Sequence, residues 1–160
     1  GCDSAHPNLI LSHDGKQVIL GVKRQNLPDN PERFALHPCV LGKDGISSRR
    51  FYYEVQVRGK YWSLGVARES INRKGKITAS PEDGLWCLWL RNENDYKALY
   101  SPLISLFLKQ APQKVGVFVD YEEGLISFYD VDAKSHIYFF TGQTFTEKSY
   151  PLFSLGLHDE

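Results

Sequence analysis

Residues Val115–Val131 read VGVFVDYEEGLISFYDV and form two apolar runs on either side of Glu122-Glu123-Gly124. Glycine readily adopts the positive φ that a tight hairpin turn requires, so Gly124 marks the point where the chain reverses. Val, Phe, Ile and Tyr occupy both faces of the two runs, which is typical of strands that are covered on both sides. This stretch therefore predicts a central antiparallel hairpin, and with it a β-rich fold.

Strand patterns recur along the rest of the chain, whereas helical patterns are nearly absent. Apolar and polar residues alternate in Phe51–Arg58, as in a half-buried strand. A second hairpin is expected where Asp14-Gly15 separates Leu9–Leu11 from Val18–Leu20. Further strands are expected at Tyr61–Ala67, Leu85–Arg91, Leu103–Leu108, His136–Phe140 and Tyr150–Ser154. About ten short strands without a long helix predict an all-β sandwich with less than roughly a tenth of its residues in helices.

The composition narrows the class of protein. At 160 residues the chain is long enough for one domain with its own core. Its 19 basic and 19 acidic residues cancel, which argues against nucleic acid or an anionic membrane as a partner. No apolar run approaches the roughly 20 residues of a membrane-spanning helix, and no signal peptide is recognised. The three cysteines lack metal-like spacing, so a reduced, cytoplasmic protein is expected.

The candidates for catalysis or metal binding are weak. The histidines are scattered singly, at His6, His13, His37, His136 and His158, and no spacing places two of them on one metal. Glu122 and Glu123 are adjacent, but a solvated hairpin tip does not give them the contrasting environments of an acid–base pair. Cys87 lies inside an apolar strand, where burial would raise the pKa of the thiol and make it a poor nucleophile. The sequence predicts a non-enzyme without metal or cofactor.

Two of the expected strands share a candidate binding face. Alternation assigns the large apolar residues of Tyr61–Ala67 and Leu85–Arg91 to the core, namely Trp62, Leu64, Val66, Trp86, Leu88 and Leu90. The opposite face has small residues such as Ser63, followed by Trp89 and Arg91. Trp89 is expected to be partly exposed, and Trp and Arg are enriched at binding hot spots. The alternative is that a loop or a helix covers this face.

A basic turn, Arg73–Lys76, follows the first of these strands and reads RKGK. It is either a solvated loop tip or an anion-binding turn. An anion site needs several cations that converge without an acid among them. Glu69, Glu93 and Asp95 lie close in the sequence and argue against such a site.

Several segments are similar to one known family. Tyr52-Tyr53-Glu54-Val55 resembles the family's aromatic-Glu-Val strand, with Tyr52 in place of a Trp. The other matching segments are Ala5-His6-Pro7, Leu9–Ser12 with Asp14, Trp62–Val66, Ser70–Gly75, Ser80–Gly84 with Trp86, Val119–Glu122 and Ser127–Tyr129. They cover nearly the whole chain in order and resemble the PRY-SPRY domain of tripartite-motif ubiquitin ligases, butyrophilins and pyrin. The PRY part would span about 1–45 and the SPRY part about 46–160. The family's closing strand is expected either to be absent, which leaves the last sheet incomplete, or to lie outside these residues.

The resemblance implies a bent two-sheet antiparallel β-sandwich, SPRY-like and of the concanavalin-like jelly-roll type. Such a domain recognises a protein through loops and a shallow pocket. By position the pocket would contain Ser63, Trp89, Arg91 and Leu157. Its rims would come from the loops Lys23–Arg33, Arg73–Lys76 and Asn92–Tyr96, which hold the remaining candidates Arg73, Lys74, Asp95 and Tyr96. Some relatives have an acidic residue or a histidine where this chain has Ser63.

The resemblance also implies a function. The chain would be the non-catalytic, C-terminal substrate-binding domain of a tripartite-motif E3 ubiquitin ligase, in the cytoplasm and with a role in innate immunity. Ubiquitin transfer and oligomerisation would belong to regions outside this chain. The alternative is a butyrophilin-like sensor that binds a small anionic ligand through Arg73, Lys74, Lys76 and Arg91. Nucleic acid and membrane insertion are not expected.

Overall fold

The computed structural model describes residues 9–11, 18–20, 33, 39–42, 50–57, 61–75, 80–91, 94–100 and 102–155. Within these ranges the regular structure is almost entirely β, and the one helical element is the three-residue 3₁₀ turn η1 (Pro81–Asp83). The prediction of an all-β fold with little helix is confirmed for this part of the chain.

The strands are short and follow one another closely. They are β1 (Leu9–Leu11), β2 (Val18–Leu20), β3 (Cys39–Leu41), β4 (Arg50–Gln56), β5 (Tyr61–Arg68), β6 (Leu85–Arg91), β7 (Asp95–Ala98), β8 (Ile104–Leu106), β9 (Lys114–Asp120), β10 (Leu125–Asp130), β11 (Ser135–Phe140) and β12 (Ser149–Ser154). Those expected from the sequence agree with these bounds to within two residues. β3 and β7 were not expected.

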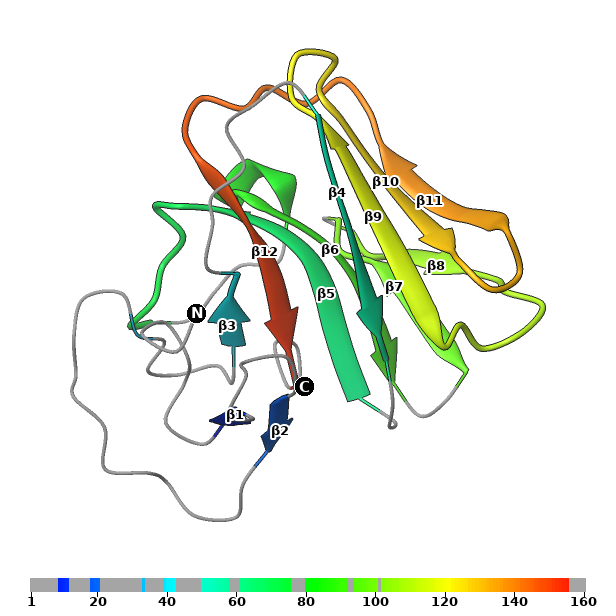
Figure 1. Cartoon of the computed structure of the whole chain (residues 1–160). Coiled ribbons are helices and arrows are strands. Elements are labelled where there is room, and N and C mark those ends of the chain that lie inside the picture. The colour runs from blue at the N-terminus through cyan, green and yellow to red at the C-terminus, as the bar shows by residue number, and fades with distance from the viewer. Residues whose placement is uncertain are drawn as a thin grey trace.

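The strands form two main sheets and a separate hairpin. A six-stranded sheet has the order β3-β12-β5-β6-β7-β8, and a four-stranded sheet has the order β11-β10-β9-β4. Figure 1 shows the four-stranded sheet lying across the six-stranded one. All pairings are antiparallel, and β1 pairs with β2 as the turn at Asp14-Gly15 predicts. The architecture is the expected two-sheet antiparallel sandwich.

The stretch 115–131 forms the middle of the four-stranded sheet. β9 and β10 pair from Leu125↔Asp120 to Asp130↔Val115, and Gly124 in the turn has a φ of 66°. The prediction of a central hairpin is confirmed. The prediction that both of its faces are covered is wrong in part, because Tyr129 on the outer face remains 36% exposed.

The main core lies between the two sheets. From the six-stranded sheet it takes the residues that alternation assigned to it, Trp62, Leu64, Val66, Trp86, Leu88 and Leu90. From the four-stranded sheet it takes Val115, Val117, Val119, Ile126, Phe128 and Phe140. This burial of apolar area is the main favourable contribution to folding. Because these residues point inward, the outer face of each sheet is left for other contacts.

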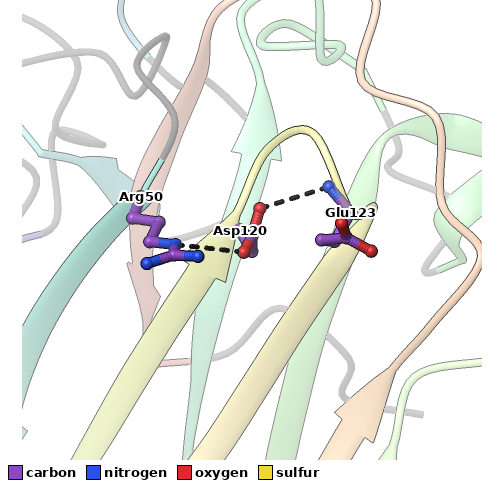
Figure 2. Close-up of polar contacts among 3 residues, drawn as sticks. All are labelled: Arg50, Asp120 and Glu123. Carbon is purple, nitrogen blue, oxygen red and sulfur yellow. Dashed lines mark hydrogen bonds and ion pairs between the residues drawn. The ribbon is translucent and has the colours of Figure 1, made fainter.

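A buried carboxylate holds the turn between β9 and β10. The Oδ1 atom of Asp120 accepts a hydrogen bond from the backbone N–H of Glu123 at 3.2 Å, and its Oδ2 atom accepts one from Nε of Arg50 at 3.3 Å. Figure 2 shows both contacts, with Arg50 reaching over from β4. The carboxylate therefore joins the turn to the neighbouring strand.

Replacing Asp120 with alanine should lower the free energy of unfolding by about 1–2 kcal/mol, because the Glu123 N–H loses its partner in a partly buried turn. Asp120→Asn is the matched control. It keeps an oxygen for the turn and loses only the ion pair with Arg50, whose side chain is 74% exposed, so it should cost less than about 1 kcal/mol. Urea unfolding curves would measure both values. Equal losses would mean that the ion pair, and not the turn contact, is the stabilising interaction.

Candidate functional site

Four of the candidate residues meet on the outer face of the six-stranded sheet. Ser63 on β5 pairs with Trp89 on β6, and Arg91 lies two residues further along β6 on the same face. In the next strand Asp95 pairs with Arg91. The prediction that Ser63, Trp89 and Arg91 share one face is confirmed, and their spacing follows from the two-residue period of a strand.

The sequence analysis predicted that Trp89 is partly exposed. This prediction is wrong, because the side chain is buried, with 7% of its surface accessible. Its ring belongs to a second apolar cluster on this side of the sheet, made up of Leu41, Ala67, Ile71, Leu85, Cys87, Leu99 and Leu152. Ser63 is buried as well. The alternative interpretation, that this face is covered, is therefore correct around Trp89 and Ser63.

Two cations lie over the Trp89 ring. The Arg91 guanidinium carbon is 5.2 Å from the ring centroid and Lys97 Nζ is 5.9 Å from it. Lys97 pairs with Trp89 across the β6–β7 ladder, and its ammonium also lies 3.4 Å from Oδ1 of Asp95. Cation–π attraction of this kind holds a guanidinium in a defined position. The buried Trp89 ring thus lies beneath the charged groups of Arg91 and Lys97, which are partly accessible.

The accessible part of this face is its end at Arg91. Tyr61, which pairs with Arg91, is 50% exposed. Asp95 and Lys97 retain 45% and 23% of their side-chain exposure. We call Tyr61, Arg91, Asp95 and Lys97 the Arg91 surface. It combines an aromatic ring, two cations and one carboxylate over the buried Trp89.

Tyr96 does not belong to this surface. It alternates with Asp95 and Lys97 along β7, so it points to the opposite face and is buried in the main core. Desolvation there raises the pKa of its hydroxyl. The structure therefore does not bring Tyr96 together with the other candidates. The sequence analysis placed it in a loop, where no face could be assigned to it.

Arg73 and Lys74 are also remote from the Arg91 surface. Arg73 Nη2 donates a hydrogen bond to the carbonyl of Glu69 at 3.2 Å, just beyond the end of β5 that lies farthest from Tyr61. The length of β5 separates the two places by roughly 20 Å, at about 3.3 Å per residue. The Asn72 side chain stabilises the turn, because its Oδ1 atom accepts a hydrogen bond from the backbone N–H of Lys74 at 3.1 Å. The basic turn and Arg91 therefore do not form one pocket.

Other predicted elements of the site lie outside the described residues. These are Leu157, Lys76, Asn92, Glu93 and, apart from the buried Arg33, the loop 23–33.

Sequence reasoning missed Tyr61 and Lys97 as members of the site. The signal for Tyr61 was available, because alternation along β5 places it on the same face as Ser63. No such signal was available for Lys97, because the sequence of β7, DYKA, does not have the composition of a strand.

The described residues contain no group of three or more His, Cys, Asp or Glu side chains that could hold a metal ion. The Cys87 side chain is fully buried. Within the same ranges, no helix is long and apolar enough to span a membrane.

Comparison with known proteins identifies the family. Residues 50–160 match the SPRY domain, and residues 2–46 match the SPRY-associated domain, PRY. The chain belongs to the PRY-SPRY family. Domains of this family are recognition modules that mediate protein–protein binding, so the Arg91 surface is a feature of a binding domain.

Among full-length relatives, the PRY-SPRY domain is 54% identical over 157 residues to nuclear factor 7, brain, of Xenopus laevis. It is 47% identical over 158 residues to human pyrin and 46% identical over 158 residues to human butyrophilin subfamily 2 member A2. Each alignment covers 98% of this chain, but only 26%, 20% and 30% of these relatives. The similarity therefore concerns one domain of longer proteins.

Solved structures agree on the fold of the PRY-SPRY domain. The TRIM65 PSpry domain superposes with a TM-score of 0.80 at 22% identity, covering 95% of this chain and 80% of that one. Stonustoxin superposes with a TM-score of 0.86 at 29% identity, covering 98% of this chain and 26% of that one.

Proposed function

We propose that this PRY-SPRY domain selects a protein target for a longer parent protein, a tripartite-motif E3 ubiquitin ligase, through the Arg91 surface. The observation that supports this surface is the Arg91 guanidinium over the buried Trp89 ring at 5.2 Å, beside the half-exposed ring of Tyr61. Arg and Tyr are the residue types that dominate binding hot spots. An arginine that is already held in place loses less conformational entropy when it binds.

The mixed charge of the surface favours a protein as the partner. Asp95 lies 3.4 Å from Lys97 and pairs with Arg91 along the sheet. A partner must therefore present groups of both signs, which an extended protein surface can do and a small anion cannot. In this proposal the parent acts in the cytoplasm, with a role in innate immunity, and transfers ubiquitin through a separate domain.

A second candidate is a sensor for a small anionic ligand, as the resemblance to butyrophilins suggested. The two cations above Trp89 favour it. Asp95 beside Lys97 counts against it, and so does the position of Arg73 at the other end of β5. An anion at Arg91 would have to displace or tolerate the carboxylate of Asp95.

Replacing Arg91 with glutamate should weaken binding of the protein partner by roughly 30-fold or more, as for other arginine hot spots. Stability should change little, because the Arg91 side chain is partly accessible. Affinity purification with the immobilised domain, followed by affinity measurements on the captured partner, would provide the test.

The matched control is Lys74→Glu, which reverses an exposed charge at the opposite end of β5. Binding that survives Lys74→Glu and fails with Arg91→Glu supports protein recognition at the Arg91 surface. Equal losses with both variants would instead favour a cationic site that includes the basic turn. Normal binding by Arg91→Glu would place the partner elsewhere.

A further inference from the structure

The outer face of the four-stranded sheet carries exposed aromatic rings that no part of the proposed function uses. Tyr52 on β4 is 49% exposed, Tyr129 on β10 is 36% exposed and Phe139 on β11 is 50% exposed. Phe118 and His136 lie on the same face. We call these five residues the aromatic patch. They come from all four strands of the sheet.

The strand register makes the patch continuous. Tyr52 pairs with Phe118 on β9, and Tyr129 pairs with His136 on β11. The His136 ring centroid lies 5.1 Å from that of Tyr129 and 4.9 Å from that of Phe139. Half-exposed rings in contact form one surface rather than isolated apolar residues, and such a surface marks an interaction site.

Gly116 lies between the Tyr52 side of the patch and the Tyr129 side, and because it has no side chain it leaves room for the Tyr52 ring. It lies between Tyr129 and Glu54 in the register, and a Cβ atom there would come within 2.3 Å of the Tyr52 hydroxyl. The Tyr52 side chain therefore lies over the bare backbone of β9, toward Tyr129. Its hydroxyl donates a hydrogen bond to Oε2 of Glu54 at 2.9 Å.

The Glu54 carboxylate and the faces of the aromatic rings favour a cation on the patch. Glu54 is exposed and accepts a hydrogen bond from Tyr52, whereas Arg50, further along the same face of β4, is engaged by Asp120. Burial lowers the pKa of His136, so this ring is neutral at pH 7. Lys114 lies one row beyond Glu54, opposite Gln56, and is a cation on the same face that counts against binding of a second one. The faces of the Tyr and Phe rings carry negative electrostatic potential, which adds to that of the Glu54 carboxylate.

We propose that the aromatic patch binds an arginine side chain of an exposed segment in a partner protein, stacked on Tyr52 and Tyr129 and paired with Glu54. A planar guanidinium can stack on aromatic rings and donate hydrogen bonds to a carboxylate at the same time. The main core separates this face from the Arg91 surface, so the domain can engage a target on one side and an arginine-bearing segment on the other.

The test is a titration of the ¹⁵N-labelled 160-residue chain, followed by NMR at low salt, where charge contacts are least screened. The probe is an acetylated and amidated octapeptide of alternating Gly and Arg. The matched peptide replaces each Arg with citrulline, which keeps the shape and removes the charge. The arginine peptide should shift the amide signals of β4, β9, β10 and β11, and the citrulline peptide should bind much more weakly.

Variants of the protein separate a cation–π site from simple apolar contact. Tyr52→Leu, Tyr129→Leu and Phe139→Leu remove a ring and keep apolar area, and each should raise Kd by roughly two- to fivefold. Glu54→Gln should have an effect of similar size. Phe107→Leu, at a residue that is 93% exposed outside the patch, and Glu82→Gln, in η1, are the controls and should bind as wild type does.

Equal binding of the citrulline peptide, or wild-type Kd values for all four patch variants, would overturn the proposal. A concentration-dependent dimer in light scattering that Tyr52→Leu or Phe139→Leu abolishes would also overturn it, in favour of a second copy of this chain on the patch. Arg91→Glu should bind the arginine peptide normally, so this result is independent of the proposed function. Signal dispersion in each spectrum shows whether a variant is folded. If Tyr52→Leu is unfolded, Phe139→Leu takes its place as the test variant.

Discussion

Replacing Trp89 with alanine should destabilise the domain by about 3–5 kcal/mol, the range for removing a large buried side chain. The ring is 7% exposed and packs in the second apolar cluster. Trp86→Ala should cost a similar amount, because Trp86 lies in the main core and donates a hydrogen bond from Nε1 to Gln143 Oε1 at 3.0 Å. The two tryptophans lie on opposite faces of β6, and both faces are buried.

Urea unfolding of both variants beside Arg91→Glu would measure these values. Arg91→Glu should stay close to wild type, because it removes a charge contact at an accessible position. Trp89 would be a surface residue if Trp89→Ala lowered the free energy of unfolding by less than about 1 kcal/mol while Trp86→Ala lowered it by about 3–5 kcal/mol. If both are destabilised as expected, loss of binding in Trp89→Ala reports on the fold, and Arg91→Glu is the variant that tests the surface.

Gly124→Ala should destabilise the domain by about 3 kcal/mol or more. The φ of 66° places residue 124 in the left-handed region, which costs an L-residue about 1–2 kcal/mol. In addition, a Cβ atom there would lie 2.0 Å from the backbone oxygen of Gln143, and relieving such a contact costs about 1–3 kcal/mol more. The Gln143 N–H also donates a hydrogen bond to the Gly124 carbonyl at 3.0 Å, so the two segments cannot separate freely.

Gly142→Ala provides a matched control for this effect. Its φ is 65°, nearly the same as that of Gly124, but a Cβ atom would meet nothing within 4 Å. Gly142→Ala should therefore lower the free energy of unfolding only by the cost of placing an L-residue at positive φ, about 1–2 kcal/mol. Thermal and urea unfolding of both variants would separate the steric cost from the backbone cost. Equal destabilisation would show that the strand ends move apart at little cost.

The sequence predicted the fold well where side-chain period and burial agree. In β5 the large apolar residues Trp62, Leu64 and Val66 recur at every second position, and the structure buries all three between the sheets. Alternation also assigned Trp86, Leu88 and Leu90 of β6 to the core correctly. β7 was missed because four residues are too few to establish an alternating pattern, and Asp95, Lys97 and Ala98 are residue types that are depleted in strands. Such a strand forms because of its neighbours β6 and β8, and its own composition does not reveal it.

The site was predicted in part for the same reason. Alternation placed Ser63, Trp89 and Arg91 on one face, which is a local property of two strands. It could not show that Leu41, Ile71 and Leu152 join Trp89 in one apolar cluster on this side of the sheet, because they come from other parts of the chain. Arg73 was assigned to a rim of the same pocket by the family resemblance. Chain order places it beyond the C-terminal end of β5, whereas Arg91 pairs with Tyr61 at the N-terminal end.

The pairing of β12 with both β3 and β5 sets the order in which the domain can assemble on the ribosome. β3 meets a strand that is synthesised roughly 110 residues later, and Figure 1 shows β12 filling the place between β3 and β5. At about 5–20 residues per second, the edges of these two strands stay unpaired for roughly 5–20 s of translation. Such long-range closure slows folding. Until β12 emerges, the nascent chain offers two open strand edges to chaperones, and to other chains that could pair with them.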